Sequence, residues 1–176
     1  PWNGRATIST ACQPDIGRGI GDPACRASIT LCHPYVFTHE LGHNLGFDHS
    51  AADLEDDGIT LPSDEYADLS CIMGNNDVWN RANAPKMVQA KWLPTSNVVD
   101  LASLSTVSQQ QNTFQIYPLD VPTSGTLQTV VFAVDGSNKY YFSYRTVSNY
   151  SRSLDSSYSN GVNVHYTVSG QLGSPR

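Results

Sequence analysis

The segment from His39 to His49 has the sequence H-E-L-G-H-N-L-G-F-D-H, and its residue types and spacing suit metal chemistry. On a helix, His39 and His43 are four residues apart, so both imidazoles project from one face. Gly46 can adopt the left-handed conformation that turns the chain out of the helix, which would bring His49 toward the same point. Three neutral imidazoles suit zinc and leave its fourth position to water. We therefore predict that His39, His43 and His49 bind Zn²⁺ at a catalytic centre.

Glu40 follows the first of these histidines and can reach the fourth position as a general base. Bound zinc lowers the pKa of water to about 7, so this carboxylate would take a proton from an already acidic nucleophile. Five fixed positions match by chance on the order of once in ten million sites. A metal-binding protein that has lost catalysis is a stronger alternative, but the presence of Glu40 argues against it. We find no competing Ser/His/Asp or Cys/His arrangement.

The elements that must position these residues follow from local patterns. We predict short strands at residues 5–9 and 27–31, the active-site helix at 35–45, and a second helix at 85–92. Further strands are predicted at four β-branched and aromatic stretches, residues 114–117, 126–134, 139–147 and 161–168, with a turn at Asp135-Gly136. The fold class is therefore α+β. Residues 1–97 form a helix-containing catalytic part, and residues 98–176 form an all-β, sandwich-like region.

The histidine segment resembles the metzincin zinc endopeptidases, whose pattern is H-E-x-x-H-x-x-G-x-x-H followed by a Met-turn. Ser70-Cys71-Ile72-Met73-Gly74 resembles that turn. The resemblance implies that Met73 lies beneath the imidazoles as an apolar floor and is not a ligand. Only 38 residues precede His39, so we expect the N-terminal half of a metzincin domain to be incomplete.

Within the metzincins the sequence is most similar to the gametolysin-like peptidases. The similarity rests on residues 37–46, 66–74, 83–86, 92–93, 140–145 and 161–166. It implies a secreted zinc endopeptidase that acts on proteins or glycoproteins of an extracellular matrix or cell wall. The alternative function is a non-catalytic adhesion or binding module, in which the β-rich part binds and the zinc site is a relic.

The amino-acid composition argues against some classes of binding partner. Sixteen acidic against ten basic residues give a net charge of −6, which disfavours nucleic acid, and no apolar run is long enough to span a membrane. Few charges and many small polar residues favour secretion. A calcium site is a weaker prediction, based on the clustered carboxylates Asp53, Glu55, Asp56 and Asp57; a solvated acidic loop is the alternative.

Four cysteines in a chain that looks secreted favour two disulfides, with three pairings open. Because Cys71 adjoins the Met-turn, we favour Cys32–Cys71 together with Cys12–Cys25. The remaining histidines, His33 and His165, are expected to be structural. Residues 98–176 are expected to pack against the catalytic part without supplying a zinc ligand.

Overall fold

The computed structural model describes residues 4–6, 27–29, 33–52, 65–74, 79–101, 113–123, 125–135, 138–159 and 161–167. Within these ranges the chain is α+β, with few helices and a small mixed sheet. No helix in the described ranges is long and apolar enough to cross a membrane. The carboxylates considered for calcium, Asp53, Glu55, Asp56 and Asp57, lie outside them.

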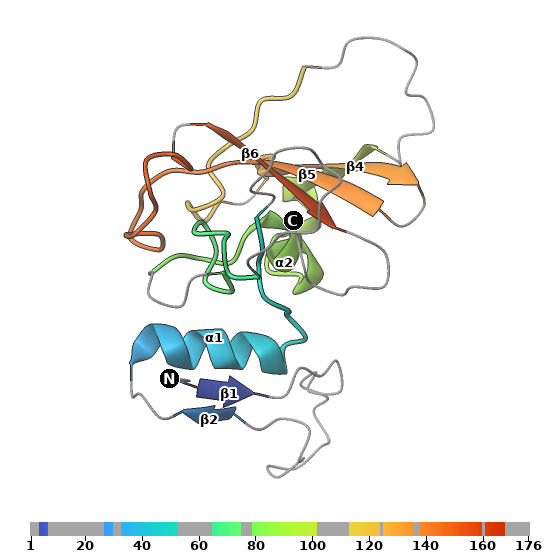
Figure 1. Cartoon of the computed structure of the whole chain (residues 1–176). Helices are drawn as coiled ribbons and strands as arrows, with labels where there is room; N and C mark the ends of the chain where they lie inside the picture. The colour runs from blue at the N-terminus through green and yellow to red at the C-terminus, as the bar shows by residue number, and fades with distance from the viewer. Residues whose placement is uncertain are drawn as a thin grey trace.

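The first layer is a pair of short strands against a helix. Strand β1 (Gly4–Ala6) pairs antiparallel with β2 (Ala27–Ile29), and both contact helix α1 (Pro34–Asn44), as Figure 1 shows. Pro34 suits the first helical position because a helix does not need the N–H there, and proline already has a helical φ. The predicted active-site helix is confirmed, one residue earlier than expected.

The end of α1 follows a Schellman motif. Gly46 has φ 83°, its N–H donates to His43 O at 2.9 Å, and Phe47 N–H donates to Gly42 O at 3.0 Å. A side chain at Gly46 would be strained at this φ. The predicted left-handed turn at Gly46 is therefore present, and it directs the chain toward His49.

Helix α2 (Ala84–Gln89) is shorter than predicted. Its N-cap, Asn83, accepts a hydrogen bond from Lys86 N–H at 3.3 Å. The helix ends where Lys91 takes φ 57°, and Trp92 N–H donates to Met87 O at 2.9 Å. The chain then enters a 3₁₀ turn, η3 (Thr95–Asn97).

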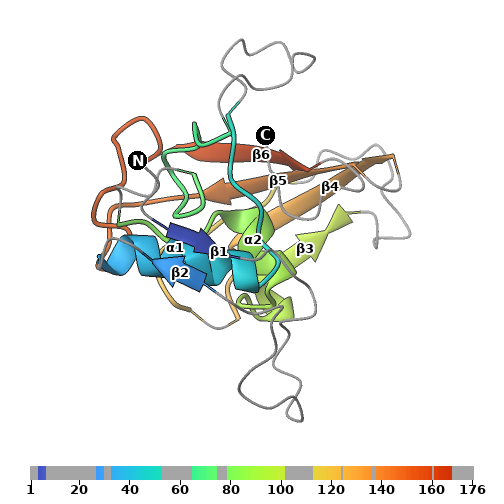
Figure 2. The same cartoon turned by 60° about the horizontal axis from the view of Figure 1, so that its bottom comes forward.

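The second layer is one four-stranded sheet. Its strands, in spatial order, are β3 (Val98–Asp100), β4 (Thr129–Asp135), β5 (Asn138–Tyr144) and β6 (Val162–Thr167). Strand β3 runs parallel to β4, and the other pairs are antiparallel. Helix α2 packs against β5 and β6 (Figure 2).

The structure corrects the predicted strands in three respects. The described part of residues 98–176 forms this single sheet and no sandwich, because α2 and the turn around residue 72 cover the inner face. Residues 114–117 are not a strand; Pro118, which lacks an N–H, makes only an isolated bridge to Tyr144. Strand β3 was not predicted, because three residues are too short to show alternation.

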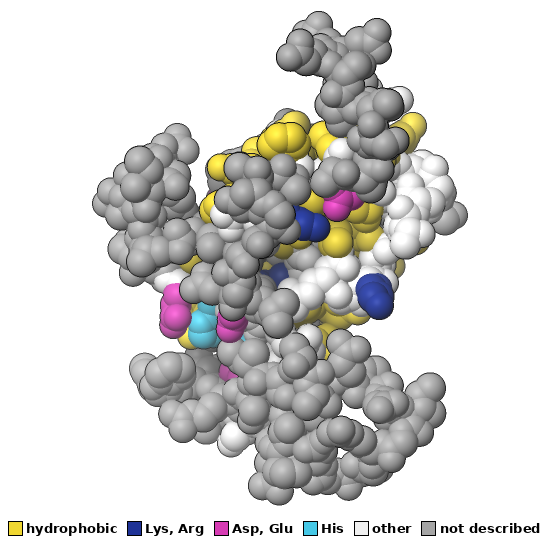
Figure 3. All heavy atoms as spheres, turned by 90° about the vertical axis from the view of Figure 1, so that its right-hand side faces the viewer, with side chains coloured by type: hydrophobic (Ala, Val, Ile, Leu, Met, Phe, Trp, Pro, Cys, Tyr) yellow, Lys and Arg dark blue, Asp and Glu magenta, His cyan; other side chains and the backbone are white. Residues whose placement is uncertain are grey.

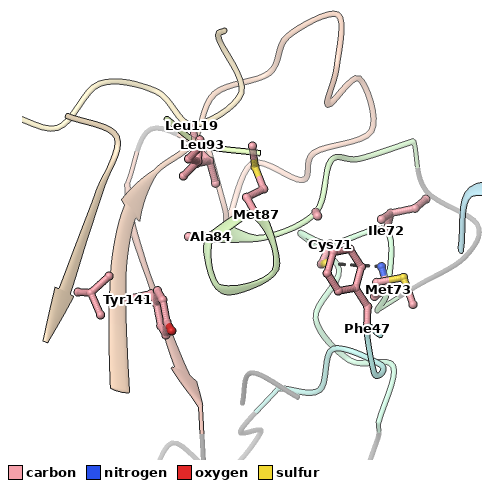
Figure 4. Packing of buried hydrophobic residues seen from close by; sticks show 11 residues of the cluster. Phe47, Cys71, Ile72, Met73, Ala84, Met87, Leu93, Leu119 and Tyr141 are labelled. Atoms are coloured by element: carbon pink, nitrogen blue, oxygen red, sulfur yellow. Dashed lines mark hydrogen bonds between the residues drawn. The ribbon is translucent and has the colours of Figure 1, made fainter. Parts of the chain in front are cut away.

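One hydrophobic cluster connects the two parts of the chain. Figure 4 shows Phe47 and Met73 on one side, and Met87, Leu119 and Tyr141 toward the sheet, all within the same buried cluster. The division at residue 97 stays a prediction, but the core itself runs across that point.

The outer face of the sheet is partly apolar. Phe132, Val162 and Val164 are about half exposed there. Hydrophobic side chains also gather at the top of Figure 3, at the level of the sheet in Figure 1. This face points away from α2.

Candidate metal centre

The three predicted histidines lie together. The ring centroid of His39 is 4.9 Å from that of His43 and 5.3 Å from that of His49, and His43 and His49 are 4.8 Å apart. One ligand atom of each lies within 4.8 Å of the others. His39 and His43 are buried on α1, whereas His49 is partly exposed. The site thus has a closed inner side and one ligand nearer to solvent.

Hydrogen bonds set the orientation of two of these rings. His39 Nδ1 lies 2.8 Å from Ile72 O, and His43 Nδ1 lies 2.7 Å from Phe47 O. A carbonyl oxygen can only accept, so both Nδ1 atoms donate. Each Nε2 then keeps its lone pair, as a metal ligand requires.

His49 is held by three neighbours that the sequence did not predict. Its Nδ1 lies 3.5 Å from the Glu65 carboxylate, and the Tyr66 ring lies 4.0 Å from its ring. Lys86 Nζ donates to its carbonyl oxygen at 3.4 Å. The sequence around Glu65 and Tyr66 has no periodic signal, so only the folded chain identifies them.

Burial favours the neutral form of all three imidazoles. Burial lowers the pKa of His39 to about 4, although its hydrogen bond to Ile72 acts in the opposite direction. Burial also lowers the pKa of His43 and of His49. Neutral imidazole is the form that binds a metal ion.

The donor set fits zinc. Three neutral nitrogens on a partly closed site match a catalytic zinc centre with one position left for water. His39, His43 and His49 would hold the zinc ion, each through one ring nitrogen. Within the described residues, this is the only group of three or more His, Cys, Asp or Glu side chains close enough to hold a metal ion.

Met73 packs directly against α1. It is fully buried, and a Cβ placed on Gly42 would lie 2.3 Å from Met73 Sδ. The neighbouring residue, Ile72, supplies the carbonyl that orients His39. The turn therefore contacts the histidine helix through both a side chain and a backbone group.

Glu40 is buried next to these ligands on the same helix. Burial raises the pKa of its carboxyl group. Its Oε2 has no hydrogen-bond partner among the described residues. Buried carboxylate oxygens are normally hydrogen-bonded, so Glu40 Oε2 is a candidate to bind a water or a substrate group.

An apolar cavity of about 410 Å³ lies beside α1 and Met73. Leu41, Leu45, Trp79 and Trp92 contribute to its wall. None of the three histidines lines it, so the chemistry belongs to the histidine cluster and not to this cavity.

The predicted Cys32–Cys71 disulfide is wrong. Cys71 is a free, fully buried thiol. Its Sγ accepts hydrogen bonds from Met73 N–H at 3.4 Å (Figure 4) and from Asn83 N–H at 3.3 Å. The sulfur is thus part of the core that supports the turn. Cys12, Cys25 and Cys32 lie outside the described residues.

Comparison with known proteins identifies the family of the chain. No solved structure matches the chain. The model of the gametolysin peptidase M11 family matches residues 1–172, nearly the whole sequence. With a three-histidine cluster in place, the chain belongs to this family of metallopeptidases.

Proposed function

We propose that the protein is a zinc endopeptidase in which His39, His43 and His49 hold the metal and Glu40 is the general base. The observation that supports this most is the closeness of three neutral imidazoles whose Nδ1 atoms, in two cases, are already used by backbone carbonyls. Zinc at this position would supply Lewis acidity toward a water and a peptide carbonyl.

The protein's own part in the reaction is proton transfer. Glu40 Oε2, buried and without a partner in the described part of the chain, accepts a proton from the attacking water and donates it to the departing amine. Burial raises the pKa of Glu40, which makes its carboxylate a stronger base than an exposed glutamate.

We further propose that the substrates are proteins or glycoproteins outside the cell. The family supports protein substrates, and the composition, rich in small polar residues, supports secretion. The calcium site and the Cys12–Cys25 disulfide stay predictions of the sequence, whereas the prediction of two disulfides is wrong because Cys71, one of the four cysteines, is a free thiol.

The test is Glu40→Gln, which keeps the shape of the side chain and removes its basicity. We expect one zinc per chain in both proteins and a loss of peptide cleavage of about 10²–10⁴-fold or more in the variant, measured with a quenched fluorescent peptide and with denatured protein. Asp100→Asn, a partly exposed carboxylate on the sheet, serves as the control and should cleave normally.

Equal cleavage by Glu40→Gln would contradict the assignment of the base. Protein binding by the zinc-loaded wild-type chain without cleavage would favour the adhesion module instead.

A further inference from the structure

The turn that carries Met73 is connected to the sheet by a buried carboxylate. Asp68 Oδ1 accepts hydrogen bonds from Ser70 N–H at 2.9 Å and from the Ser70 hydroxyl at 2.5 Å. Asp68 Oδ2 accepts one from Asn83 Nδ2 at 3.0 Å. On β6, His165 Nε2 lies 3.4 Å from the same oxygen. The carboxylate thus joins the turn, the start of α2 and the sheet.

The Asp68 carboxylate is the charged group in this contact. Burial acts to raise the pKa of Asp68, but the hydrogen bond and charge of His165, with the hydrogen bonds of Ser70 and Asn83, lower it to about 2. His165 is also buried, and its Nδ1 has no hydrogen-bond partner among the described residues. Among the described residues, Asp68 is therefore the polar partner of the His165 ring.

A second buried contact comes from the end of β5. Arg145 and Asp120 are both fully buried and form a bidentate pair, with Nε–Oδ2 at 3.1 Å and Nη2–Oδ1 at 2.6 Å. Arg145 Nη1 also donates to the carbonyl oxygen of Ser70. The guanidinium thus spans from the sheet to the turn.

The opposite side of the turn contacts the histidines. His39 Nδ1 donates to Ile72 O, and Ser50 N–H, next to His49, donates to Met73 O at 2.9 Å. Asp68 N–H donates back to Ser50 O at 3.1 Å. The turn therefore has metal-site contacts on one side and sheet contacts on the other.

We propose that His165 and Arg145 are positioning residues of the metal centre, which hold the turn at residues 68–74 so that Ile72 and Ser50 keep His39 and His49 in place. This inference rests on the proposed zinc site. It assigns the sheet a part in metal binding, although the sheet supplies no ligand. Neither residue belongs to the histidine cluster, so their effect is expected on the affinity and geometry of the site.

The experiment compares His165→Leu with His165→Gln in the full chain. Leucine removes the donor to Asp68, whereas the Nε2 amide of glutamine can restore it. Lys139→Gln is the matched control, because it breaks a partly exposed pair with Asp100 on the same sheet. Zinc affinity is measured by competition with a chelator, and the geometry by the visible absorption of the Co²⁺-substituted protein.

We expect His165→Leu to bind zinc about 10-fold more weakly and to show altered Co²⁺ bands. Loss of a supporting partner around metal ligands typically costs 10–100-fold in affinity, and His165 acts through an intermediate group. His165→Gln should recover most of the affinity, and Lys139→Gln should match the wild type.

A His165→Leu protein that melts at a lower temperature but keeps wild-type zinc affinity and Co²⁺ bands would overturn the proposal, because its role would then be structural only. If His165→Leu does not fold, His165→Asn decides in the same assays, since its shorter amide does not reach Asp68. A wild-type chain that binds no zinc would contradict the proposed function itself, which separates the two failures.

Discussion

Gly42→Ala tests whether Met73 lies where the structure places it. The new Cβ would lie 2.3 Å from Met73 Sδ and 3.2 Å from its Cε. Heavy-atom contacts in packed interiors are about 3.5–4.0 Å, so the overlap with sulfur exceeds 1 Å. Met73 is fully buried, so a shift of its thioether toward the adjoining cavity would sacrifice part of its present packing.

Two effects of this substitution oppose each other. Alanine within a helix gains about 0.8–1.0 kcal/mol over glycine. Overpacking of a filled interior costs about 1–3 kcal/mol. The expected net loss is about 1 kcal/mol in the free energy of unfolding, measured by urea denaturation of the metal-free protein. Zinc affinity should fall as well, because Ile72 and Met73 bond to the histidine segments.

Gly161→Ala is the matched control. A Cβ there meets no heavy atom within 4 Å, so stability should change little. Met73→Ala removes the thioether. In that background, adding Gly42→Ala should cost little further free energy of unfolding, because the clash is gone. If Gly42→Ala is about 1 kcal/mol more stable than the wild type, then Met73 does not pack against α1 and the account of the turn is refuted.

Three further predictions concern the rest of the fold. Asp120→Asn leaves the buried Arg145 guanidinium without its counter-charge and should destabilise by about 3–5 kcal/mol, seen as a large drop in melting temperature. Lys91→Gly should stabilise by up to about 1 kcal/mol, because Lys91 has φ 57°; an unchanged melting temperature would argue against strain there. In the metal-free protein, the pKa of His39 is lower in the folded than in the unfolded chain. The free energy of unfolding therefore keeps its full value above about pH 6.5 and falls as the pH is lowered toward 4, where the unfolded chain binds a proton that the folded chain does not. The loss is about 3 kcal/mol, checked by urea titrations across that range.

Local rules were sufficient for the histidine segment. The spacing of His39 and His43 and the conformation of Gly46 depend only on helix geometry and on the left-handed region open to glycine. Both signals lie within a few residues, so the sequence predicts the helix, its end and the approach of His49.

The supporting contacts could not be predicted in the same way. Glu65 reaches His49, and His165 reaches Asp68, only through tertiary packing, and nothing in the local sequence of either residue indicates these contacts. Ile72 lies in the segment that resembles a Met-turn, but the hydrogen bond of its carbonyl to His39 could not be predicted from the sequence. Cys71 was misassigned because cysteine count and compartment favoured a bridge, whereas the fold places the thiol within the core.

For the sheet, too, the sequence predicts the local elements but not their tertiary contacts. Strands β4, β5 and β6 were recognisable from β-branched and aromatic residues. Strands β4 and β5 pair antiparallel, with Asp135 opposite Asn138; Gly136 of the predicted turn lies outside the described residues. What covers their inner face was not recognisable, because a buried face has the same composition beneath a helix as beneath a second sheet.

The central claim is that His39, His43 and His49 hold one zinc ion. Zinc-edge X-ray absorption on the zinc-loaded protein tests it most directly. We predict three imidazole nitrogens at about 2.0–2.1 Å, an oxygen ligand, and no sulfur near 2.3 Å, with the zinc lost in His43→Ala. Fewer than three imidazoles, a sulfur ligand, or full zinc retention by His43→Ala would contradict the claim.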